Sequence, residues 1–186
     1  RGRSPNTDEV RTIVHEEESA IDDKGAKLSV LDAQAVVAAL TGDPAAVEVE
    51  ALLRDRDDAA CISAVNVSEV LDVLVRHQGW PADEVEEKVR WLTVGGLQVV
   101  AVDEAVGLLA GRLHARHYHR TRRPLSLADC IALATSLSLG ERLATSDPAL
   151  LAAAADEGCP CTASPMLEGS GLQSEPSPRR DLRRPE

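Results

Sequence analysis

Short apolar runs alternate with segments whose apolar residues recur every three or four positions, from about residue 28 to residue 165. Runs of the first kind are typical of buried strands, and segments of the second kind are typical of amphipathic helices. The pattern predicts strands at 28–32, 60–63, 97–102 and 142–145, with a last, poorer strand near 159–163. It predicts helices at 33–41, 45–55, 65–77, 82–94, 104–120, 126–139 and 148–155.

Glycine and proline residues support these boundaries. Gly79 and Gly140 follow two of the predicted helices. Pro81 and Pro148 stand at helix starts, where a missing backbone N–H is tolerated. Because short apolar strands alternate with helices, we predict an α/β fold in which helices cover both faces of a central parallel sheet.

The two ends of the chain differ from its centre. Residues 1–27 are polar, and residues 166–186 are rich in proline, glycine and arginine. We therefore expect a poorly ordered leader, one domain at 28–165 and a disordered tail. No apolar stretch approaches the roughly 20 residues that span a bilayer, and the acidic leader is unlike a signal peptide. We expect a cytoplasmic protein that has no membrane partner.

Composition and charge narrow the function. Hydrophobic residues make up 44% of the chain and aromatic residues only 2%, so the core must consist of Leu, Val, Ile and Ala. The formal net charge of −11 argues against a protein that coats nucleic acids, because phosphate contacts need basic residues. It leaves open an enzyme that gathers carboxylates around metal ions. The four cysteines show no metal-site spacing, and we interpret them as buried or incidental thiols.

Four acidic residues mark places where a predicted strand ends or a helix begins: Asp32, Glu69, Asp129 and Asp147. Ligand sites in parallel α/β folds lie beyond the carboxyl ends of the strands, so we expect these acids to converge. Each also has a simpler structural explanation. Asp32 and Asp147 could cap helices, Ser126 and Asp129 fit a capping box, and Glu69 could be a surface acid.

The neighbours of these acids are mostly apolar or small, which bears on their chemistry. Carboxylates in one pocket of low dielectric repel each other unless divalent cations lie between them. Ligand sets made only of oxygen atoms favour Mg²⁺ or Mn²⁺ over zinc. Helix N-termini that point at the same spot favour a phosphate. The expected chemistry is therefore metal-assisted hydrolysis of a phosphodiester.

Other polar residues could support these acids. Asn66 lies one helical turn before Glu69, so the two side chains share a face. Thr145 and Ser146 precede the fourth acid and could orient its carboxylate or the attacking water. Asp72 lies one turn beyond Glu69, where it could join the network or be exposed in a salt bridge.

A basic segment precedes the third acid, and residues 105–128 contain no Asp or Glu. Its candidate RNA contacts are Arg112, Arg116, Tyr118, Arg120, Arg122 and Arg123. The alternative is a solvated helix end, because cations suit a helix C-terminus. Three histidines in this segment lack a matching half of a zinc site.

Four short motifs, taken in their order and spacing, resemble those of one known family. They are Val30-Leu-Asp32, Ile62-Ser-Ala-Val-Asn-Val-Ser-Glu-Val70, Leu125-Ser-Leu-Ala-Asp129 and Thr145-Ser-Asp147. Over residues 28–163 the chain resembles the PIN-domain family, and in particular the VapC-type ribonuclease toxins of type II toxin–antitoxin systems. The resemblance implies a three-layer α/β/α domain that binds one or two Mg²⁺ or Mn²⁺ ions through the four acids, with Thr145 in support. It also implies a homodimer and a cognate antitoxin.

The hypothesis is a metal-dependent endoribonuclease that hydrolyses RNA to products with 5′-phosphate and 3′-hydroxyl ends. One alternative is a housekeeping nuclease of the same fold without an antitoxin, and another is a non-catalytic binding module whose acids only cap helices. A phosphoryl-transfer enzyme with Asp32 as nucleophile is disfavoured, because the dehalogenase-like families have a second Asp where this chain has Gln34.

Overall fold

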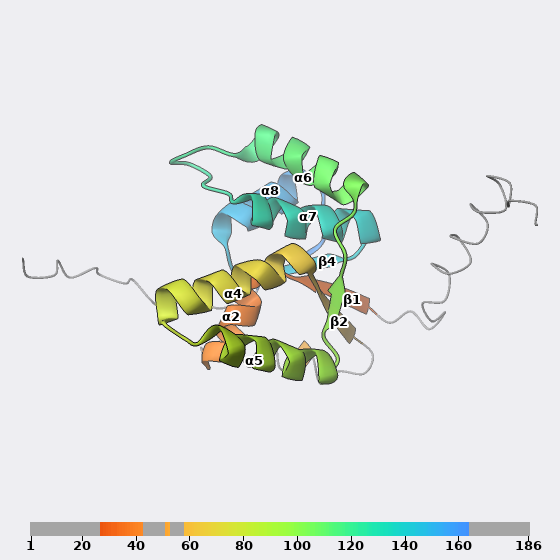
Figure 1. The fold of residues 1–186 in the computed structure, drawn as a ribbon. Coiled ribbons are helices and arrows are strands. Elements are labelled where there is room, and N and C mark those ends of the chain that lie inside the picture. Colours follow the sequence, from red (N-terminus) through yellow and green to blue (C-terminus); the bar gives the residue numbers. More distant parts are fainter. Residues whose placement is uncertain (1–26, 43–50, 53–57, 164–186) are drawn as a thin grey trace, which may run out of the picture.

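A computed structural model describes residues 27–42, 51–52 and 58–163 of the chain. The predicted tail and nearly all of the predicted leader lie outside the described residues. So does most of the predicted helix at 45–55, of which residues 51 and 52 are described as helical. Figure 1 shows the described part of the chain as a central sheet with helices on both sides.

Five strands form one sheet in the order β3-β2-β1-β4-β5, and every neighbouring pair is parallel. The strands are β1 (Lys27–Leu31), β2 (Asp58–Ser63), β3 (Gln98–Val100), β4 (Arg142–Thr145) and β5 (Cys161–Ala163). β1 lies at the centre of the sheet, with β2 and β3 on one side of it and β4 and β5 on the other. In open parallel sheets, ligands bind beyond the carboxyl ends of the strands where the strand order switches sides in this way, so the junction after β1 is a natural ligand site.

Six helices cover the sheet within the described residues. They are α2 (Ala33–Thr41), α4 (Ala64–Gln78), α5 (Ala82–Val94), α6 (Glu104–His117), α7 (Leu127–Leu139) and α8 (Pro148–Asp156). Figure 1 shows α6, α7 and α8 on one side of the sheet and α2, α4 and α5 on the other. None of the described helices is long and apolar enough to cross a membrane.

Alternate residues of the strands supply two separate cores. Val30 and Leu143 pack with the apolar face of α6, α7 and α8, whereas Leu31, Ile62 and Ala144 pack with α2, α4 and α5. Successive side chains of a strand point to opposite faces, so each short strand serves both layers. The three-layer α/β/α fold with a parallel sheet is therefore confirmed.

Glycine ends three of the helices, two of them at the glycines that the sequence indicates. Gly42, Gly79 and Gly140 are C-caps with φ near 70°, a left-handed conformation that residues with a Cβ rarely adopt. The predicted helix 104–120 is wrong at its end, because α6 stops at His117 and Tyr118 is extended. The backbone N–H groups of His119 and Arg123 donate to each other's carbonyl oxygens instead of continuing the helical pattern.

Burial in the α7 layer predicts the energetic importance of single leucines. Leu133 is fully buried in the middle of α7, whereas Leu127 on the same helix is 53% exposed. Leu133→Ala should lower the free energy of unfolding by about 2–5 kcal/mol, because it leaves a cavity. Leu127→Ala should cost less than about 1 kcal/mol. Urea unfolding followed by circular dichroism measures both, and equal losses would contradict this assignment of the core.

Candidate active site

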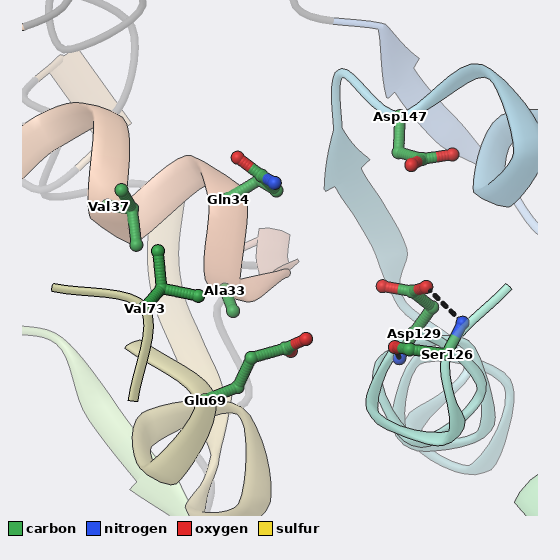
Figure 2. Close-up of a pocket in the computed structure, with 8 residues that line it drawn as sticks. All are labelled: Ala33, Gln34, Val37, Glu69, Val73, Ser126, Asp129 and Asp147. Carbon is green, nitrogen blue, oxygen red and sulfur yellow. Dashed lines mark hydrogen bonds between the residues drawn. The ribbon is translucent and has the colours of Figure 1, made fainter. Parts of the chain in front are cut away.

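The starts of four helices meet at the carboxyl edge of the sheet. There Glu69, Asp129 and Asp147 line one pocket of the described residues, together with Ala33, Gln34, Val37, Val73 and Ser126. Figure 2 shows Glu69 extending from α4 toward the side of the pocket where the other two acids lie. The structure therefore brings three of the four predicted acids to a common space.

Asp32 does not line this pocket but lies buried beside it, with only 1% of its surface exposed. It is the N-cap of α2, and its Oδ1 accepts the Ala35 N–H at 2.7 Å. Its Oδ2 accepts the Thr145 hydroxyl, which itself accepts the Asp147 N–H at 3.0 Å. Thr145 therefore ties the carboxylate of Asp32 to the backbone of the loop that carries Asp147.

Burial dominates the ionisation of Asp32. It raises the pKa of this carboxyl from 3.8 to about 6, although the hydrogen bonds from Thr145 and Ala35 act in the opposite direction. The negative charges of Asp129 and Asp147 raise the pKa further. Asp32 is therefore close enough to Asp129 and Asp147 for their charges to interact.

Asn66 connects the second acid to two neighbouring elements. Its Oδ1 accepts the Ser63 hydroxyl at 2.5 Å, and its Nδ2 donates to the backbone oxygen of Ala128 at 3.1 Å. The same Nδ2 lies 3.4 Å from Glu69 Oε2. Burial, followed by the charge of Asp129, raises the pKa of Glu69. Asn66 therefore fixes Glu69 relative to the start of α7.

The capping explanations also hold in the structure. Ser126 and Asp129 form a complete capping box, with Asp129 Oδ2 accepting the Ser126 N–H at 2.6 Å. Asp147 caps α8 by accepting the Leu150 N–H at 2.8 Å through Oδ1, with Pro148 at the first helical position. Burial raises the pKa of Asp129, and the charge of Asp147 adds to this effect.

Asp129 and Asp147 each use one carboxylate oxygen for the cap, whereas both oxygens of Asp32 accept hydrogen bonds. Within the described residues, no hydrogen bond reaches Asp129 Oδ1, Asp147 Oδ2 or Glu69 Oε1. A carboxylate has lone pairs on both oxygens, so one oxygen can hold a helix N-terminus while the other faces a ligand. Capping and ligand binding are therefore compatible at this site.

The donor set suits a hard cation. The eight described residues that line the pocket include no Lys, Arg or His, so no cationic side chain there offsets the clustered acids. Oxygen ligands of this kind favour Mg²⁺ or Mn²⁺. As the described side chains stand, no three of them converge enough to hold one ion. Water would complete the coordination of an ion bound here, as is usual for Mg²⁺.

Sequence reasoning assigned three polar residues no place in the site, although it named Ser126 as a capping residue and mentioned Gln34. Gln34 and Ser126 line the pocket, and Ser63 holds Asn66 in place. Ser63 and Asn66 have the same three-residue spacing as Ser126 and Asp129, which is the signal that could have identified Ser63.

Two residues near the acids have different surroundings. Ser146 is half-buried in the loop before Asp147, and no hydrogen bond to its hydroxyl occurs among the described residues. Asp72 is exposed and lies 3.4 Å from Arg76 one turn along α4, as the salt-bridge alternative predicts.

The basic segment divides into two groups. Arg112, Arg120 and Arg122 are exposed and form no ion pair with other described residues. Arg116 lies 2.7 Å from Glu157 and Arg123 lies 2.8 Å from Asp156. Tyr118 is 48% exposed and stacks on His114, with ring centroids 4.8 Å apart. The role of these residues in RNA binding stays a prediction.

The buried charge of Asp32 makes stability depend on pH. Because its pKa is about 6 in the folded protein and near 3.8 when unfolded, the folded state holds a proton that the unfolded chain releases between these values. The free energy of unfolding should therefore fall as the pH rises through this window. In EDTA, the free energy of unfolding of Asp32→Asn should equal that of the wild type at pH 4. At pH 7.5 it should be higher than that of the wild type, by on the order of 1–3 kcal/mol.

Asp103→Asn provides a matched control for that measurement. Asp103 caps α6 by accepting the Val106 N–H at 2.8 Å, but it is exposed. Its replacement should change stability by less than about 1 kcal/mol at either pH. A variant Asp32→Asn that is less stable than the wild type at pH 7.5 would contradict the electrostatic cost of burial.

Comparisons with known proteins place this fold. No curated protein matches the sequence. Among solved structures, the chain is similar to VapBC2 from Rickettsia felis bound to a promoter DNA fragment, with 12% identity and a TM-score of 0.55 over 73% of this chain and 98% of that chain. It is also similar to VapBC-1 from nontypeable Haemophilus influenzae, with 16% identity and a TM-score of 0.56 over 74% and 98% of the two chains.

A third similar structure is VapC20 from Mycobacterium tuberculosis, a sarcin–ricin loop cleaving toxin, with 20% identity and a TM-score of 0.54 over 67% of this chain and 94% of that chain. Identities this low show a likeness of fold. The sequence itself matches the PIN domain over residues 29–156, a span that contains all four acids. The chain therefore belongs to the PIN domain family.

Proposed function

We propose that this protein is a Mg²⁺- or Mn²⁺-dependent endoribonuclease and the toxin of a toxin–antitoxin pair. One observation carries the proposal: three carboxylates of a PIN domain line a pocket without a cationic side chain, next to a fourth, buried carboxylate. The pKa values of Asp32, Glu69 and Asp129 are raised because burial and the neighbouring carboxylates disfavour the charged form. A divalent cation bound among these acids would favour the charged form.

Asp32, Glu69, Asp129 and Asp147 are the residues that would hold the ion. A bound Mg²⁺ or Mn²⁺ would supply a water of lowered pKa and neutralise charge that develops on the phosphate. The chain itself fixes the ligands, because the Thr145 hydroxyl orients Asp32 and the Asn66 amide orients Glu69. Such secondary contacts tune ligand orientation in metal sites. Ser146 is proposed to orient the attacking water.

RNA is the proposed substrate because a basic segment leads directly into α7, which carries Asp129. The fold likeness to a sarcin–ricin loop cleaving toxin supports the same substrate class and the role of a toxin. The likeness to VapBC structures supports a cognate antitoxin as partner. We further propose a homodimer in the cytoplasm. A housekeeping nuclease of the same fold would have the same site and no antitoxin.

Cleavage of a structured RNA under Mg²⁺ or Mn²⁺ titration tests the activity. Asp32→Asn and Asp129→Asn should each reduce the cleavage rate by about 100-fold or more, the scale for losing one preorganised electrostatic group. Both variants keep a good helix cap, so circular dichroism should show intact folds. Asp103→Asn, which changes a cap outside the pocket lining, should cleave like the wild type. Equal rates for all four proteins would refute the four acids as the active site of a nuclease.

The cap hydrogen bonds favour one second candidate, a binding module whose acids are purely structural. Thermal melting with and without Mn²⁺ separates the two. A metal site should raise the melting temperature of the wild type and leave that of Asp129→Asn unchanged, because only the folded state holds the ion. Identical shifts in both proteins, or none, would favour the binding module.

A further inference from the structure

Two arginines of the basic segment are tied to the end of α8 rather than free. Arg116 Nη1 lies 2.7 Å from Glu157 Oε1, and Arg123 Nη1 lies 2.8 Å from Asp156 Oδ2. His117 contacts a member of each pair, Glu157 and Arg123. We call these five residues the clasp. It connects chain positions about 40 residues apart, so it is a tertiary feature rather than part of a helix end.

His117 lies at the centre of the clasp, with 7% of its side chain exposed. Arg123 Nη1 donates to His117 Nδ1 at 2.8 Å, which leaves the Nε2 proton to be donated to Glu157 Oε1 at 2.6 Å. Hydrogen bonds from His117 and then Arg116 hold the pKa of Glu157 below its usual range. The ring is therefore fixed from both sides.

The clasp holds the base of a short basic hairpin, residues 119–123. His119 and Arg123 form an antiparallel bridge, with backbone N–H groups donating at 2.9 and 3.0 Å. His119 Nδ1 accepts the backbone N–H groups of Thr121 and Arg122 at 3.3 and 3.1 Å. This organised turn carries Arg120 and Arg122, both exposed and unpaired among the described residues.

The base of the hairpin, at Arg123, is joined to the acid pocket by a short stretch of chain. Arg123 is three residues before Ser126, which lines the pocket, so their Cα atoms are at most about 11 Å apart. Figure 1 shows the connection between α6 and α7 projecting past the ends of these helices. An RNA strand with one phosphate in the pocket would therefore have neighbouring phosphates within reach of the hairpin.

We propose that the clasp is a positioning device for RNA: Arg116, His117 and Arg123 hold the basic hairpin in place, and Arg120 and Arg122 contact phosphates. Arg116 and Arg123 already have carboxylate partners, and a phosphate would have to displace them. Arg120 and Arg122 would lose no such partner on binding. The inference rests on the proposed function for the choice of RNA as ligand.

Binding of a fluorescein-labelled single-stranded RNA to the full chain in EDTA tests the proposal without cleavage. Arg120→Gln with Arg122→Gln should weaken binding on the order of tenfold at 0.1 M salt and reduce the slope of log Kd against log salt by about 1.4. Arg90→Gln is a control for the loss of a positive charge elsewhere on the surface, because Arg90 is exposed on α5 and pairs with Glu86. It should leave affinity within about twofold.

The acidic half of the clasp gives the sharper test. Asp156→Asn with Glu157→Gln removes two negative charges, so simple electrostatics predicts tighter RNA binding. The clasp predicts weaker binding instead, by roughly threefold or more, because the hairpin is no longer held. The variant that exchanges the two charges, Arg123→Asp with Asp156→Arg, keeps an ion pair at this place and should bind RNA with most of the wild-type affinity. It should not do so if Arg123 itself contacts phosphate.

Activity assays complete the design. In a cleavage assay, the Asp156→Asn, Glu157→Gln protein should show a raised KM with kcat within about twofold, because the acids of the pocket are untouched. Unchanged or tighter binding by this protein, or a charge exchange that fails to restore binding, would overturn the clasp. RNA binding that depends on the hairpin, without any cleavage by the wild type, would uphold the clasp and refute the nuclease.

Discussion

The desolvated carboxylate of Asp32 is the constraint around which the candidate site is arranged. It is held at the junction of β1 and α2 by one backbone N–H and one hydroxyl, with almost no contact to water. A buried charge is costly unless it is paired or hydrogen-bonded. The remaining three acids add negative charge to the same region. The carboxylates therefore repel one another at a place where a bound cation would be stabilised.

Stability and chemistry share the same side chains in this protein. Asp32, Asp129 and Asp147 each satisfy a helix N-terminus. Helix N-termini carry partial positive charge, which partly offsets the carboxylates that cap them. Each cap also fixes the direction of its carboxylate. The capping interactions therefore preorganise the acids and do not compete with a ligand role.

Two helices link the acid pocket to the basic hairpin. The hairpin runs through a short connection into α7, where Asp129 lies in the first turn. Asp147 begins α8, and Asp156 and Glu157 at the far end of this helix hold the clasp. Both helices pack in the same apolar layer. Close packing in this layer holds the acid pocket and the basic hairpin in fixed positions relative to each other.

The sequence by itself determined the alternation of strands and helices, the glycine C-caps and the chain positions of the four acids, because these follow from periodicity and local capping chemistry. Only the tertiary structure decided that Asp32 lies beside the pocket rather than in its lining, and that α6 ends at His117. The clasp partners of His117 and Arg123 lie more than thirty residues away in the chain. Periodicity carries no information about such pairs, since three-dimensional packing alone brings their charges together.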